Sequence, residues 1–264
     1  MSTAIPVDPV HPPAPYLGGK RALAGRIIEH INRTPHDGYA EPFVGMGGVF
    51  FRRDRRPKTE VINDINGEVA NLFRILQRHY PQFMDTLKFQ VTSRREFERL
   101  ARCQPATLTD LERAARFLYL QKTSFGAKVV GQTFGVTKDG GARFNLTRVA
   151  PLLEEVHERM AGVVIECLGW AEFIDRWDRT GMLFYFDPPY WNGESDYGKG
   201  VFSRADFAAL AKRLRRLKGR FILSINDVPE VRETFSGFKR TPVSLTYSIT
   251  GGKGTPAKEL IVMG

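Results

Sequence analysis

The chain has 264 residues, 42% of them hydrophobic, which is enough for one domain of ordinary size with a sizeable core. Its 39 Lys and Arg against 29 Asp and Glu give a net charge of +10, which favours nucleic acid or an anionic membrane surface as a partner over a merely soluble basic protein. The 2 cysteines, Cys103 and Cys167, lack metal-ligand spacing and argue against a disulfide framework or a zinc site, so we expect a reducing, cytoplasmic setting. No apolar run approaches the ~20 residues of a membrane-spanning helix.

Along the chain, short β-branched or aromatic runs alternate with helical patterns, which is typical of βαβ units around a mostly parallel sheet. The Pro-rich residues 1–15 lack the charged and apolar regions of a signal peptide and predict a flexible lead-in. Seven strands are predicted, at residues 39–44, 59–64, 162–167, 182–187, 220–225, 240–249 and 258–263. Helical patterns occupy residues 20–32, 67–79, 93–102, 108–122, 149–160 and 203–218.

An interval of about a hundred residues separates the second and third predicted strands, far more than the few residues usual in such folds. We therefore expect an insertion there. Residues 88–148 within it carry 12 Lys or Arg against 5 Asp or Glu. Most of the excess positive charge of the whole chain thus lies in this insertion.

The segment EPFVGMGGVFF (residues 41–51) places three glycines between a predicted strand and a helix, where missing Cβ atoms let a ligand lie against the backbone. No Gly-Lys-Ser/Thr follows, as a phosphate-binding Walker loop would need, and a third glycine at dinucleotide spacing is lacking. Alone, the loop fits a tight turn equally well. Asp64, however, ends the next strand 19 residues after Gly45, close to the ~20 at which an acid reaches a ribose hydroxyl. Together they indicate a nucleoside-type site.

The stretch LFYFDPPYW (residues 183–191) runs an apolar strand into an acid, two prolines and two aromatics. Asp187 and Pro188 each precede a proline, which favours extended backbone and makes the loop stiff. At the carboxyl end of a central strand, the Asp187 carboxylate and the Pro188 carbonyl would face the ligand crevice, and both groups only accept hydrogen bonds. An exocyclic amino group on an aromatic ring fits such acceptors, with Tyr190 or Trp191 stacked on that ring. A strand that merely ends in a turn explains the prolines but not the acid and the aromatics together.

These segments resemble those of the Dam-like adenine-N6 DNA methyltransferases. DPPY matches their catalytic motif, EPFVGMGGVF their cofactor loop and PYLGGKRAL (residues 15–23) their N-terminal cofactor motif, and similar segments follow in order to the final KELIVMG. The resemblance implies an α/β, Rossmann-like methyltransferase fold with a seven-stranded, mostly parallel sheet whose last strand is antiparallel. It also implies a catalytic domain at residues 1–66 and 158–264, and an inserted, mainly helical target-recognition subdomain at residues 67–157.

The activity implied by the resemblance is methyl transfer from S-adenosylmethionine to adenine N6 in double-stranded DNA, by base flipping and without a metal. The catalytic residues it implies are Asp187, Pro188 and Tyr190. The residues it implies for cofactor binding are Tyr16, Lys20, Phe43, Gly45, Gly47, Asp64 and Asp187. The residues it implies for DNA binding are Lys122, Ser124, Lys128, Lys138 and Arg143. We expect a monomer without a membrane association, in the cytoplasm and encoded by a bacterium or a phage.

Three alternatives stay open at this point. The first is methylation of another amino group, such as cytosine N4. The second is an oxidoreductase that binds a dinucleotide at the glycine loop. The third is a non-catalytic DNA-binding relative, which Gly169 supports slightly, since close relatives have an acid before the aromatic at Trp170. That acid would meet the adenine amino group of the cofactor, and Glu166 or backbone carbonyls could substitute for it.

Overall fold

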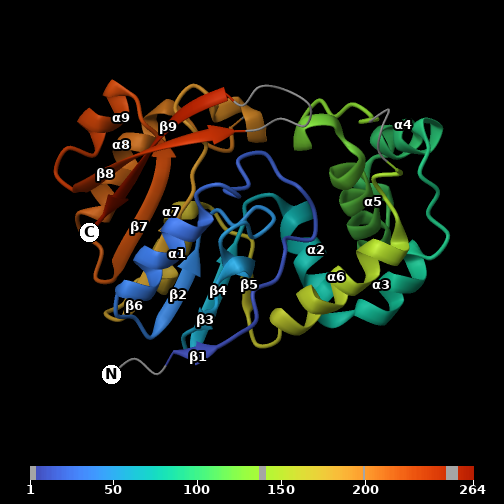
Figure 1. Cartoon of the computed structure of the whole chain (residues 1–264), viewed down its shortest axis with the longest axis horizontal. Helices are drawn as coiled ribbons and strands as arrows, with labels where there is room; N and C mark the ends of the chain where they lie inside the picture. Colours follow the sequence, from blue (N-terminus) through green and yellow to red (C-terminus); the bar gives the residue numbers. More distant parts are fainter. Residues whose placement is uncertain (1–3, 137–140, 199, 248–254) are drawn as a thin grey trace.

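A seven-stranded sheet forms the centre of the computed structural model, which describes residues 4–136, 141–198, 200–247 and 255–264 (Figure 1). The strand order is β5-β4-β2-β6-β7-β9-β8. Strands β5, β4, β2, β6 and β7 are parallel to one another, and β9 is antiparallel to both β7 and β8. The bounds are β2 (Gly38–Glu41), β4 (Thr59–Asn63), β5 (Val164–Glu166), β6 (Met182–Phe186), β7 (Arg220–Asn226), β8 (Lys239–Tyr247) and β9 (Thr255–Met263). All seven predicted strands are confirmed.

Strand β6 shows why this sheet is covered on both faces. All five of its residues are buried, as expected of a central parallel strand. Because side chains alternate across a strand, Leu183 and Tyr185 join one hydrophobic cluster, and Phe184 and Phe186 join the other. Helices α1 (Ala24–Arg33) and α2 (Gly67–Arg78) contribute to the first cluster, and α7 (Trp170–Trp177), α8 (Arg204–Leu214) and α9 (Pro229–Thr234) contribute to the second.

The insertion follows β4 and consists mainly of helices, which Figure 1 shows gathered beside the sheet. After α2 come α3 (Tyr80–Leu87), α4 (Arg94–Arg102), α5 (Asp110–Thr123) and α6 (Leu146–Arg159), and β5 then returns to the sheet. A capping box of Thr109 and Glu112 begins α5, and the Ser93 side chain caps α4. Short 3-10 turns lie at Phe50–Arg52, Pro105–Thr107, Phe125–Ala127 and Glu194–Tyr197.

The N-terminal segment differs from its prediction. Residues Ile5–Pro6 (β1) pair with Arg55–Arg56 (β3), and the Val10 amide donates to the Phe51 carbonyl at 2.7 Å. Val10 and Ala14 are buried in the core. The prediction of a flexible lead-in is therefore wrong for residues 4–15, because the backbone finds hydrogen-bond partners and two small apolar side chains find a place in the core.

Element boundaries differ for local reasons. Strand β2 ends at Glu41, before the predicted residue 44, because Pro42 has no N–H to donate to a neighbouring strand. Helices α3, α7 and α9 were not predicted, and each has eight residues or fewer. Segments this short show barely two turns of periodicity, so their apolar spacing is hard to recognise.

Candidate active site

A cavity of about 1880 Å³ opens at the carboxyl ends of β2, β4 and β6. Its walls come from the N-terminal segment, the glycine loop, the strand exits and the segment after α5. Most of the predicted site residues line it: Tyr16, Lys20, Phe43, Gly45, Asp64, Lys122, Ser124, Arg143 and Asp187. Residues far apart in the sequence therefore meet where open α/β sheets bind ligands.

The glycine loop is shaped by positive backbone angles. Gly45 has φ +51° and Gly47 has φ +73°, a region that side chains rarely adopt. A Cβ on Gly45 would lie 2.8 Å from the Tyr16 ring, and one on Gly47 would lie 2.4 Å from the Phe51 ring. The loop thus needs glycine at both positions to let aromatic rings pack against its backbone.

Asp64, which follows β4, holds this loop in place. One carboxylate oxygen accepts from the Gly45 amide at 2.9 Å, and the other accepts from the Asn66 amide at 2.9 Å. Burial raises the pKa of Asp64 to about 6, although both of these hydrogen bonds oppose the shift. A carboxylate in this place retains lone pairs that can accept hydrogen bonds from ligand hydroxyls.

Aromatic rings surround the space above Asp64. The Tyr16 ring lies 6.0 Å from that of Tyr197, whose hydroxyl donates to the Leu17 carbonyl at 3.0 Å. Phe43 meets Phe202 edge to face at 5.8 Å. Tyr197 was missed from the sequence, since it stands in a polar stretch after DPPYW whose path the sequence does not fix.

Asp187 stands directly after β6, and its side chain is 20% exposed, toward the cavity. Its Oδ1 lies 2.9 Å from Lys20 Nζ and accepts from the Ser224 hydroxyl at 3.4 Å. Burial raises the pKa of Asp187 to about 6, while the Lys20 ammonium opposes the shift. Hydrogen bonds between Asn226 and the Trp191 backbone, at 2.9 and 3.1 Å, fix the end of this stiff loop.

Lys20 belongs to a buried cluster with the loop that follows β6. Its side chain is 2% exposed, and Nζ lies 4.2 Å from the centre of the Tyr190 ring and 4.0 Å from a Glu259 oxygen. The Tyr190 hydroxyl is hydrogen-bonded to both Lys20 and Glu259. Glu259, on β9, was not singled out from the sequence, but a lone acid within the apolar run ELIVM was the available signal.

Glu41 is a second acid that sequence reasoning missed. It ends β2, lines the cavity and accepts a hydrogen bond from the Tyr39 hydroxyl at 2.7 Å. Burial raises the pKa of Glu41 to about 8, and the Tyr39 hydrogen bond opposes this. The side chain is therefore mainly neutral at pH 7 and can donate a hydrogen bond as well as accept one.

The predicted DNA-binding residues fall into three groups. Lys128 is exposed. Lys122, Ser124 and Arg143 lie on the cavity wall: Lys122 Nζ donates to the Pro13 carbonyl at 3.1 Å, and Arg143 donates to the Ser124 carbonyl at 2.9 Å. Burial lowers the pKa of Lys122. Lys138 lies outside the described residues.

Gly169 lies at the N-cap of α7, and as a glycine it has no side chain to cap the helix. A Cβ placed there would meet no atom within 4 Å, so an acid at this position would have room. Glu166 is occupied elsewhere, since it accepts from the Trp177 indole at 3.2 Å and pairs with Arg176 at 3.6 Å.

Neither a metal site nor a membrane span occurs among the described residues. They contain no group of three or more His, Cys, Asp and Glu that could hold a metal ion. In the same part of the chain, each helix is too short or too polar to cross a membrane.

Comparison with known proteins gives a family. Residues 16–249 match the profile of the D12 class N6 adenine-specific DNA methyltransferases. The chain is 26% identical over 250 residues to the Type II methyltransferase M1.LlaDCHI of Lactococcus lactis subsp. cremoris, covering 88% of this chain and 86% of that protein. It is 22% identical over 254 residues to the Type II methyltransferase M.CviBI of Paramecium bursaria Chlorella virus NC1A, covering 93% of this chain and 94% of that protein. It is 24% identical over 259 residues to the DNA N-6-adenine-methyltransferase of Escherichia phage P1, covering 89% of this chain and 32% of that protein.

Proposed function

The chain belongs to the D12 class of N6 adenine-specific DNA methyltransferases, and from this premise we propose that it methylates a flipped-out adenine of double-stranded DNA with S-adenosylmethionine as the donor. The observation that carries the proposal is the position of Asp187. It stands in the same cavity as Asp64 and the glycine loop, so an acceptor for an amino group lies beside a pocket suited to a nucleoside.

The residues around Asp64 fit S-adenosylmethionine. The Asp64 carboxylate would accept hydrogen bonds from the ribose hydroxyls, and Tyr16 and Phe43 would line the cofactor, with the backbone of Gly45 and Gly47 close to it. The donor supplies a methyl group already activated on a sulfonium centre. The protein has to add positioning and charge stabilisation, and Asp187 lies where it can supply both.

Adenine N6 is a weak nucleophile because its lone pair is delocalised into the ring. The Asp187 carboxylate and the Pro188 carbonyl would accept hydrogen bonds from its two N–H groups. These bonds favour a more tetrahedral nitrogen with a directed lone pair. Tyr190 would pack on the face of the flipped base. Lys20 donates to Asp187, and Tyr190 and Glu259 give this ammonium further contacts, so that its place beside Asp187 can pass to the amino group of the base.

We assign DNA binding to the insertion, residues 67–157, and methyl transfer to residues 1–66 and 158–264. Lys122, Ser124, Lys128, Lys138 and Arg143 would hold phosphates or read bases near the target. We further propose that the protein acts as a monomer in the cytoplasm of a bacterium, or as a phage-encoded enzyme.

Mass spectrometry of nucleosides tests this function. Unmethylated DNA is incubated with the purified protein and S-adenosylmethionine and then digested. We expect N6-methyldeoxyadenosine, and modified-base sequencing of the same DNA should place it in one short sequence context. N4-methyldeoxycytidine, or no methylated nucleoside, would contradict the proposal.

A further inference from the structure

Gln121 is a buried amide that joins three segments around the cavity. It lies in the last turn of α5 and is 0% exposed. Its Nε2 donates to the carbonyls of Pro15 and Ala127, both at 2.9 Å, and its Oε1 accepts from Gln132 Nε2 at 3.2 Å. Both amide hydrogens and the oxygen are therefore used, and the three bonds lead to two segments, one at Pro15 and the other at Ala127 and Gln132.

One of these parts is the segment that follows α5, residues 124–136, which we call the DNA-side loop. It contains Ala127 at φ +56°, a left-handed conformation that is uncommon for alanine and persists where the surroundings impose it. The Gln121 bond to the Ala127 carbonyl is one such restraint. The Phe125 amide donates to the Thr133 carbonyl within the loop, and the Gly135 amide donates to the carbonyl of Thr123, the last residue of α5, each at 2.8 Å.

The other part is residues 13–20, which we call the cofactor-side segment. Pro15 accepts from Gln121, and the next residue, Tyr16, packs against Gly45 of the glycine loop. Lys122 adds a second bond from α5, to the Pro13 carbonyl at 3.1 Å. The position of Tyr16 thus depends on the C-terminal end of α5.

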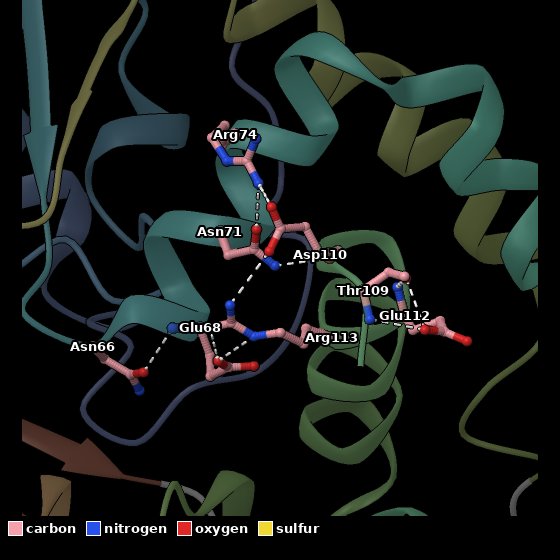
Figure 2. Close-up of polar contacts among 8 residues, drawn as sticks. All are labelled: Asn66, Glu68, Asn71, Arg74, Thr109, Asp110, Glu112 and Arg113. Atoms are coloured by element: carbon pink, nitrogen blue, oxygen red, sulfur yellow. Dashed lines mark hydrogen bonds and ion pairs between the residues drawn. The ribbon is translucent and has the colours of Figure 1, made fainter. Parts of the chain in front are cut away.

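The N-terminal end of α5 is fixed to α2 (Figure 2). Arg113 contacts Glu68 of α2, with its Nε 3.0 Å from the carboxylate, and Asn71 of α2 donates to the Asp110 carbonyl at 2.8 Å. The Asn66 side chain caps α2, and the Asn66 backbone N–H donates to the Asp64 carboxylate at 2.9 Å. One helix therefore connects Asp64 at one end with Tyr16 and the DNA-side loop at the other.

We propose that Gln121 is a positioning residue that couples the cofactor pocket to the DNA-side loop. The inference rests on the proposed function. A cofactor that packs against Tyr16 restrains the cofactor-side segment, and Gln121 transmits this restraint to Ala127 and Gln132. The cofactor should then strengthen DNA binding, and DNA should strengthen cofactor binding by the same factor.

Two glutamine variants separate coupling from stability. Gln121→Met removes the bonds to Pro15 and Ala127. Gln77→Met is a matched control, since Gln77 Nε2 also donates to two carbonyls, Met160 and Val163, both at 2.8 Å, but away from the cavity wall. The Kd is measured by fluorescence anisotropy for an unmethylated duplex that carries the sequence methylated by the protein, with and without saturating S-adenosylhomocysteine.

We expect wild type and Gln77→Met to bind DNA about 5- to 150-fold more tightly with S-adenosylhomocysteine, and Gln121→Met to lose most of that ratio. An unchanged ratio in Gln121→Met, or a wild-type ratio of one, would overturn the coupling role.

If Gln121→Met does not fold, hydrogen exchange of the wild type decides. S-adenosylhomocysteine alone should slow exchange at the Phe125 and Gly135 amides, and unchanged exchange would overturn the proposal. A wild type that does not methylate adenine would count against the proposed function instead, and the exchange experiment would still test whether the cofactor-side segment and the DNA-side loop are coupled.

Discussion

Three acids on the cavity wall, Glu41, Asp64 and Asp187, share one property, which is that burial raises the pKa of each. Folding therefore favours their protonated forms. Their stabilising contribution is fully present below their ordinary pKa values and is lost as the pH rises through about 6 for Asp64 and Asp187 and about 8 for Glu41. The protein thus gives up stability at neutral pH to hold acidic side chains where a ligand can use them.

Glu41→Gln should make the free energy of unfolding less dependent on pH. The variant keeps an oxygen for the Tyr39 hydroxyl but cannot ionise. As the pH rises from the ordinary pKa of 4.5 to about 8, the free energy of unfolding of the wild type should fall relative to that of the variant, by up to roughly 5 kcal/mol. Urea unfolding at pH 5 and pH 9 measures this, and a constant difference between the two proteins would show that Glu41 does not titrate in this way.

Asp64→Ala should weaken S-adenosylmethionine binding by roughly 10- to 150-fold, because the ligand no longer has a charged group to receive its hydrogen bonds. It should also cost about 1–3 kcal/mol of stability, since two backbone amides no longer have an acceptor. Asp178→Ala is the control, because Asp178 likewise accepts from two backbone amides, Lys218 and Gly219. Calorimetry measures the affinity for S-adenosylmethionine. Equal affinity in the two folded variants would show that Asp64 does not contact the cofactor.

At the scale of elements, α5 joins the inserted helices to the N-terminal segment, through bonds from Gln121 and Lys122. Two of its cations differ in kind. Lys128 is exposed, whereas Lys122 is bound to the Pro13 carbonyl and contributes to the cavity wall. The net charge of the insertion therefore overstates the number of cations available to phosphates.

Replacing Lys128 and Arg143 together by Ala should weaken DNA binding and flatten its salt dependence, by roughly one unit of slope for each phosphate that the protein no longer neutralises. Lys212→Ala with Arg216→Ala removes the same charge from and beside α8, outside the insertion, and should change the slope less. Equal slopes of log Kd against log salt in the two double variants would exclude Lys128 and Arg143 from the interface.

At the scale of the whole molecule, the sheet was predictable and much of the site was not. Seven strands and the insertion follow from periodicity and spacing, and the DPPY loop and Asp64 follow from their places at strand ends. Glu41 and Glu259 were missed because the role of a buried acid within a strand becomes clear only when its partners, Tyr39, Lys20 and Tyr190, are placed in three dimensions. The order of the N-terminal segment likewise depends on contacts with residues about forty positions away, such as that of Val10 with Phe51, which no local pattern shows.

Single-turnover methylation by Asp187→Ala tests the central claim most directly. Loss of one preorganised electrostatic partner in a desolvated site typically costs ~100- to 1,000-fold in rate, and the variant should lose at least that much while its affinity for DNA changes little. Asp227→Asn is the control, since Asp227 follows the neighbouring strand β7 and pairs with Arg232 instead. If folded Asp187→Ala transfers a methyl group to adenine at nearly the wild-type rate, Asp187 does not act on the reacting amino group.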